Sequence, residues 1–279
     1  MFAKVYQNTI KTLLRTPTFW MMLAVLMTIL TYSNAGLLKS AIQSERIHDA
    51  DSYHNLINNI SVAKLMVYPL PLFAVVSTVL ILNHDYGDQF FEIEKAYSMH
   101  PMCYLACRLL ALITVSGALM IMLSFLYLHL NVFMHGGVEG LSVWDYLADS
   151  FVRIMRVCWL LCIPSLSFFI VLTYTVGTVF KSGFAAMIVS ASYVIFFYLS
   201  QLTLHLRYEP IYQVYFRFFN PLPRALRLYA AMADTGYFAS VLSKHNDRPI
   251  HIVLGFCSLV FFIGLGVGIA YHRIRKRFV

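Results

Sequence analysis

The amino-acid sequence predicts an all-α integral membrane protein with six transmembrane helices. Of its 279 residues, 59% are apolar and only 12% are charged, and the mean hydropathy is +0.69. A soluble domain could not cover its surface with so few charged side chains. A helix needs roughly 20 apolar residues to cross the bilayer core, and six windows of this kind contain no Lys, Arg, Asp or Glu.

The six windows follow one another along the whole chain, so we expect a single transmembrane domain over residues 1–279. Continuous apolar runs favour helices over barrel strands, in which apolar and polar residues alternate. The first window is too long for the apolar part of a signal peptide, and we expect it to be retained. The predicted spans are Phe19–Leu38, Leu65–Leu82, Leu109–Met134, Val157–Phe180, Ser182–Leu204 and Ile250–Tyr271.

Residues 1–18 predict an amphipathic helix that lies at the membrane surface. Pro17 separates this helix from the first span, because proline lacks an amide donor and disfavours helix at the residue before it. A plain basic flank of the first span is the alternative. The apolar positions at helical spacing are Phe2, Val5, Tyr6, Ile10, Leu13 and Leu14, and the polar ones elsewhere around the helix are Lys4, Asn8, Lys11 and Arg15.

An acidic segment connects the second and third windows. It contains Asp85, Asp88, Glu92 and Glu94, four of the thirteen acids in the chain. The first three of these recur at i, i+3 and i+7, so on a helix they would share one face, with Tyr97 available for packing. The segment therefore predicts a short docking helix, with a solvated connector as the alternative.

Several kinds of site are not predicted by this sequence. There is no Gly-x-x-x-x-Gly-Lys-Ser/Thr loop for ATP, and neither His-Glu-x-x-His nor Gly-x-Ser-x-Gly occurs. The windows also contain no carboxylate for acid-base chemistry or proton coupling. An integral membrane enzyme, or a haem protein using His129 and His251, remains the alternative to a transporter.

The cysteines and the net charge point to no metal and no nucleic acid. Cys103 and Cys107 share a helical spacing, as do Cys158 and Cys162, but the two pairs are expected at different membrane depths, so no metal site follows. The charge of +8 is scattered along the spans, which favours anionic membrane lipids over nucleic acid as partners.

In this order, the features resemble the permease subunits of type-2 ABC transporters. The resemblance covers nearly the whole chain. It rests on Leu14-Arg-Thr-Pro-Thr-Phe-Trp20, on the stretch from Asp85 to Arg108 with its acids, proline and arginine, and on Phe219-Asn-Pro-Leu-Pro-Arg224. It implies six spans, an N-terminal interfacial helix, a coupling helix between spans two and three, and a re-entrant segment before the last span.

The resemblance also implies an ABC exporter subunit that is not itself an enzyme. ATP and Mg would bind a separate ATP-binding cassette subunit, this chain would hold no cofactor, and it would pair with a second copy or a homologous permease. Both termini would be cytoplasmic in a bacterial plasma membrane, an orientation that ten inner and eleven outer basic residues leave open. A turn at Phe180–Gly183 would touch the ATPase, as would the coupling-helix residues Asp85, Asp88, Glu92, Glu94 and Tyr97.

By the same analogy, the second and fifth spans would line the translocation path. A path without charge suits an amphipathic substrate such as a peptide, an antibiotic or a lipid-like molecule. Ordinary helix packing is the alternative for each candidate residue, and the Gly264-x-x-x-Gly268 motif indicates close helix contact more than a substrate site. The candidates are Ser77, Thr78, Ser190, Tyr193, Phe197 and Gln201.

Overall fold

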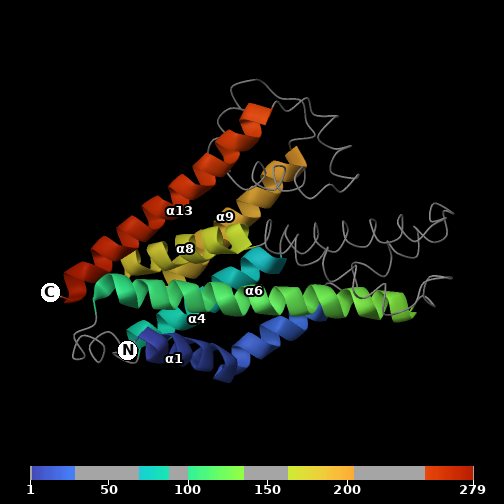
Figure 1. The fold of residues 1–279 in the computed structure, drawn as a ribbon, viewed down its shortest axis with the longest axis horizontal. Coiled ribbons are helices and arrows are strands. Elements are labelled where there is room, and N and C mark those ends of the chain that lie inside the picture. Colours follow the sequence, from blue (N-terminus) through green and yellow to red (C-terminus); the bar gives the residue numbers. More distant parts are fainter. Residues whose placement is uncertain (1, 29–68, 88–99, 135–162, 204–248, 279) are drawn as a thin grey trace.

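The computed structural model describes residues 2–28, 69–87, 100–134, 163–203 and 249–278. All regular secondary structure in these residues is helical, which confirms the predicted all-α class (Figure 1). The helices are α1 (Phe2–Arg15), Pro17–Thr28, α4 (Pro69–Gly87), α6 (Pro101–Met134), α8 (Ile163–Phe180), α9 (Gly183–Thr203) and α13 (Pro249–Phe278).

Two segments are long and apolar enough to cross a membrane within the described part of the chain. They are Pro101–Leu119 in α6 and Cys257–Lys276 in α13. Shorter apolar helical stretches occupy Pro17–Thr28, Leu166–Phe180 and Gly183–Ile195. These lengths and compositions support a membrane protein, while the number of six spans stays a prediction.

Two contacts bring the ends of several helices together at one end of the bundle. Near the end of α4, the Tyr86 hydroxyl donates a hydrogen bond to the Gly177 carbonyl of α8 at 3.1 Å. At the start of α6, the ring of His100 stacks on Tyr271 of α13 with centroids 6.5 Å apart. The start of α1 and the end of α13 lie at this end too, on the left of Figure 1.

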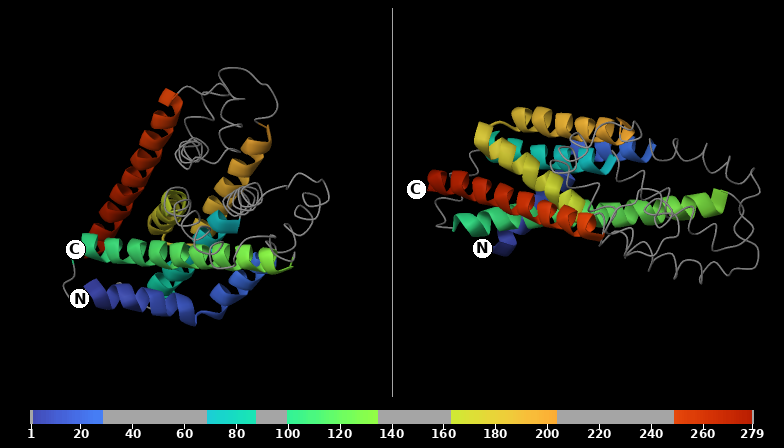
Figure 2. Two further views of the ribbon diagram at one scale, coloured as in Figure 1. Left: turned by 45° about the vertical axis from the view of Figure 1, so that its right-hand side comes forward. Right: turned by 90° about the horizontal axis from the view of Figure 1, so that it is seen from above.

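Helix α8 occupies the centre of the bundle. It packs against α4, α6, α9 and α13, and Figure 2 shows it between α13 on one side and α4 with α9 on the other. Burial extends around the helix, because the four consecutive residues Phe168, Phe169, Ile170 and Val171 are each no more than 6% exposed. A central helix surrounded in this way must be apolar around most of its circumference, as its sequence is.

Helix α1 packs on α6 through one narrow face. Val5, Thr9 and Leu13 are buried, and these positions repeat every four residues. Lys4 and Lys11 are exposed, as the amphipathic pattern predicts. The helix ends before Pro17, as the sequence indicates, and its location at a membrane surface stays a prediction.

A tight turn joins α8 to α9 next to the end of α4. Lys181 has a positive φ of 54°, and the amide of Ser182 donates to the Gly177 carbonyl at 3.3 Å, which is the pattern of a Schellman helix end. The Ser182 hydroxyl accepts from the Ala185 amide at 3.3 Å and caps α9. A Cβ at Gly183 would overlap the Asn83 side-chain amide, so the turn lies directly against the end of α4.

Candidate functional site

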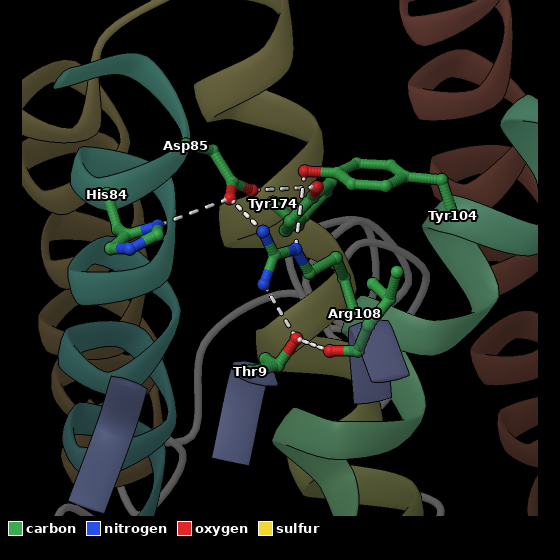
Figure 3. Close-up of polar contacts among 7 residues, drawn as sticks. Thr9, His84, Asp85, Tyr104, Arg108 and Tyr174 are labelled. Atoms are coloured by element: carbon green, nitrogen blue, oxygen red, sulfur yellow. Dashed lines mark hydrogen bonds and ion pairs between the residues drawn. The ribbon is translucent and has the colours of Figure 1, made fainter. Parts of the chain in front are cut away.

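The candidate site is a buried ion pair between the last turn of α4 and the third turn of α6. Asp85 lies at the carboxyl end of α4, where the helix dipole disfavours a negative charge. A cation must therefore lie close to this carboxylate for it to be stable when buried. Arg108 provides that cation, because its position in α6 faces the end of α4 (Figure 3).

The Arg108 guanidinium is at the centre of the hydrogen-bond network. Its Nη2 donates to Oδ1 of Asp85 at 2.5 Å, its Nη1 donates to Oγ1 of Thr9 at 2.6 Å, and its Nε donates to Oη of Tyr104 at 3.2 Å. The Tyr174 hydroxyl lies 3.5 Å from Oδ2 of Asp85 as a further donor. All three guanidinium nitrogens are therefore engaged, as the forked geometry of arginine allows.

Four helices meet in this network. Thr9 comes from α1, Asp85 from α4, Tyr104 and Arg108 from α6, and Tyr174 from α8 (Figure 3). The Thr9 hydroxyl also donates to the Val5 carbonyl at 2.8 Å, which fixes its rotamer so that its oxygen faces the guanidinium. The network thus fixes the relative positions of α1, α4, α6 and α8.

Because both side chains are buried, removing either partner of this ion pair lowers the free energy of unfolding. The exposed fraction is 0% for Arg108 and 1% for Asp85. Asp85 lies beyond the predicted span Leu65–Leu82, and burial raises the pKa of its carboxyl, while the adjacent Arg108 opposes that shift. Removing one partner of such a pair typically costs about 3–5 kcal/mol because it leaves a buried charge uncompensated.

The pair also connects the two ends of the predicted coupling segment. Helix α4 ends at Gly87 and α6 begins at Pro101, so residues 88–99 connect the two helices. Asp85 and Arg108 lie on either side of this segment, 23 residues apart in the sequence. A force on this segment would therefore act on the end of α4 and the start of α6, which the Asp85–Arg108 pair holds together. Through the hydrogen bonds of that pair, it would also act on α1 and α8.

The structure gives Asp85 a different environment from the one predicted for a docking residue. Its carboxylate is buried against Arg108 and offers no surface to a partner protein. The physical reason is that α4 continues past the apolar window and carries Asp85 into the bundle. Asp88, Glu92, Glu94 and Tyr97 lie outside the described residues.

The proposed path residues lie largely between helices in this structure. Ser77 and Thr78 of α4 and Ser190 of α9 are completely buried, and α4 and α9 pack against each other. Tyr193 is half-buried and contacts Phe168, with ring centroids 5.8 Å apart. Phe197 and Gln201 lie on α9, and their side chains are outside the described set. A role in a substrate path stays a prediction for all six.

Sequence reasoning identified only Asp85 as a site residue and missed the four other members of the network. Tyr104 lies one helical turn before Arg108, and that spacing could have identified it. Asp85 and Arg108 flank consecutive apolar windows with opposite charges, which was a signal for a pair. Thr9 and Tyr174 gave no signal, because the register between distant helices is not visible in one sequence.

The described residues contain no group of three or more His, Cys, Asp or Glu that could hold a metal ion. Cys103, Cys107 and Cys257 do not form disulfides, and Cys158 and Cys162 lie outside the described residues. Comparison with protein-family models and with curated protein sequences found no match to this chain. The relation to ABC transporter permeases therefore rests on the sequence resemblance.

Proposed function

We propose that this chain is the membrane-spanning permease subunit of an ATP-driven ABC exporter for an amphipathic substrate such as a peptide, an antibiotic or a lipid-like molecule. One observation carries the proposal more than any other. The buried Asp85–Arg108 pair joins the two ends of the predicted coupling segment and connects them to α1 and α8.

Coupling requires that the helix ends on both sides of the segment be held rigidly. When an ATPase closes on nucleotide, it moves the segment that it touches. This movement can reach the spans only if the junctions between the segment and the spans are rigid. A buried, fully hydrogen-bonded ion pair is harder to separate than an exposed one, because separating it leaves two charges in an apolar interior. The network would thus transmit a displacement of residues 88–99 to four helices together.

A second feature supports the same assignment. The α8–α9 turn, which the resemblance predicts as a smaller ATPase contact, lies against the end of α4 through Tyr86 and Asn83. The α8–α9 turn, the end of α4, the start of α6 and the end of α13 therefore lie at one end of the bundle. A single ATP-binding subunit could reach this end from the cytoplasm.

The partners follow from the proposal. A separate ATP-binding cassette subunit would supply ATP and Mg, and a second copy of this chain or a homologous permease would complete the transporter. The chain alone should have no ATPase activity, because it has no phosphate-binding loop.

The test is affinity purification of the full chain from its native membranes in mild detergent, followed by ATPase measurement in proteoliposomes. We expect an ATP-binding cassette subunit to co-purify and ATP hydrolysis to require both proteins. ATPase activity from this chain alone, or no ATPase among its partners, would contradict the proposal.

Topology provides an independent test. We expect tags at Met1 and Val279 to be accessible only from the cytoplasm, and a tag inserted near Asp51 to be accessible only from outside. Protease protection in right-side-out vesicles measures this, and termini on opposite sides would exclude six spans.

A further inference from the structure

Helix α13 has one face inside the bundle and one face outside it. Leu259, Ala270 and Ile274 are buried, and Thr175 of α8 donates a hydrogen bond to the Gly266 carbonyl at 2.9 Å. The opposite face is exposed and apolar for about three turns, and it then becomes basic. In order along the chain, its residues are Phe261, Gly264, Leu265, Gly268, Ile269, His272, Arg273 and Lys276.

This exposed face forms a shallow groove of about 570 Å³. Gly264 and Gly268 line it, and a Cβ at either position would meet nothing within 4 Å, so the space over both glycines is open. Leu265 and Ile269 line its apolar part, and Arg273 and Lys276 line its end. From Gly264 to Lys276 the groove runs about 18 Å along the helix, at about 1.5 Å per residue.

The basic end of the groove has no nearby acid in the part of the chain that the structure describes. Asp85 is the only carboxylate among those residues, and it is buried against Arg108. The charges of Arg273 and Lys276 are therefore not balanced by a described side chain. An apolar groove that ends in two cations is complementary to a molecule with an apolar tail and an anionic head.

We propose that this groove binds one anionic phospholipid, with an acyl chain over Gly264 and Gly268 and the phosphate between Arg273 and Lys276. The inference goes beyond the proposed transport function and rests only on the location of α13 in a membrane. It places the headgroup at the end of the bundle where the α8–α9 turn and the start of α1 lie.

A second copy of the chain fits the same groove less well. Glycines spaced by four residues allow two helices to pack closely. In a parallel pair, however, Arg273 and Lys276 would face their own counterparts, and like charges at short distance repel. An anionic lipid removes that repulsion, so the basic end favours the lipid.

The test is native mass spectrometry of the full chain, purified in detergent and mixed with phosphatidylglycerol and phosphatidylcholine of identical acyl chains. We expect one phosphatidylglycerol to be retained per chain in preference to phosphatidylcholine. The double variant Arg273→Gln/Lys276→Gln should lower this affinity about 25-fold, or roughly five-fold for each charge near the lipid surface. Gly268→Leu should lower retention of both lipids by filling the groove.

A matched double variant, Lys4→Gln/Arg275→Gln, removes two exposed charges outside the groove and should leave retention unchanged. The proposal would be overturned by equal retention of the two lipids, or by an equal loss in the matched variant, which would indicate general charge attraction. It would also be overturned if the wild type formed a lipid-free dimer that Gly268→Leu dissociates.

Discussion

Helices α6 and α13 both contain a segment long and apolar enough to span a membrane, yet they are built into the molecule in opposite ways. In α6, 56% of the segment Pro101–Leu119 is buried within the protein, whereas in α13 only 17% of Cys257–Lys276 is buried. Helix α6 holds its cation, Arg108, inside the bundle against a carboxylate. Helix α13 carries Arg273 and Lys276 on its outer face.

The difference teaches that apolar length alone does not reveal the role of a helix. A cation on the buried face of a helix must have partners, so it organises the helices around it. A cation at the end of an exposed apolar face needs no protein partner, because water or lipid headgroups can solvate it. Helix α6 is thus part of the core of the bundle, whereas α13 leaves most of its apolar segment exposed.

The largest expected effect comes from removing the buried cation. Arg108→Ala should destabilise the protein by about 3–5 kcal/mol because Asp85 is left buried without a counter-ion. We expect a large fall in the melting temperature of the detergent-purified protein. Arg275→Ala on α13 is the matched control and should leave that temperature nearly unchanged, since Arg275 is exposed. Equal effects from the two variants would remove the contrast between the helices.

Two glycines on α13 allow its two faces to be compared directly. A Cβ at Gly266 would lie 2.6 Å from Cγ1 of Val171, whereas one at Gly268 would meet nothing within 4 Å. Gly266→Leu should therefore destabilise the protein by about 2–3 kcal/mol through overpacking. Gly268→Leu should be neutral or slightly stabilising. Thermal unfolding of both variants checks this, and a reversed order would mean that the buried face has been misassigned.

A smaller effect is expected where α1 joins the network. Thr9→Val removes the oxygen that accepts a hydrogen bond from Nη1 of Arg108, and should cost about 1.5 kcal/mol, as for a hydrogen bond to a charged group. Thr28→Val provides the control, because the exposed hydroxyl of Thr28 donates to the Ala24 carbonyl of its own helix. Thermal unfolding measures both variants. If they unfold at the same temperature, the contact between α1 and Arg108 does not contribute to stability.

The smallest expected effect lies in the α8–α9 turn. Lys181→Gly should stabilise the protein by about 1 kcal/mol, because the left-handed conformation of this residue costs a side-chain-bearing residue more than glycine. Thermal unfolding measures the gain. A loss of stability would show that the Lys181 side chain contributes more than its backbone conformation costs.

Helix positions were largely predictable from the sequence. The window Ser182–Leu204 corresponds closely to α9, since long apolar runs determine where helices lie in such a chain. The window Ile250–Tyr271 begins with α13, which continues beyond it to Phe278. The window Leu109–Met134 has the same end as α6 but begins eight residues late, because a charge-free criterion excludes Arg108. The structure retains that arginine in the helix because Asp85 neutralises it.

The site was less predictable than the helices. Asp85 was interpreted as a surface residue of the coupling segment, because its i, i+3, i+7 spacing with Asp88 and Glu92 describes one helix face. Spacing reports neighbours on one helix and cannot report that Arg108, 23 residues later, lies opposite. Contacts with α1 and α8 depend on how the helices pack, which periodicity does not encode.

We propose that residues 88–99 transmit the movement of an ATP-binding subunit to the end of α4 and the start of α6, which the Asp85–Arg108 ion pair holds together. The most direct measurement is substrate-dependent ATP hydrolysis by the reconstituted complex carrying Asp88→Lys/Glu92→Lys, compared with wild type. Neither acid lies within a predicted span, so the variant should be expressed and should unfold at the wild-type temperature. We predict that substrate no longer stimulates its ATP hydrolysis and that transport is lost. Normal stimulation and normal transport in the folded variant would contradict the account.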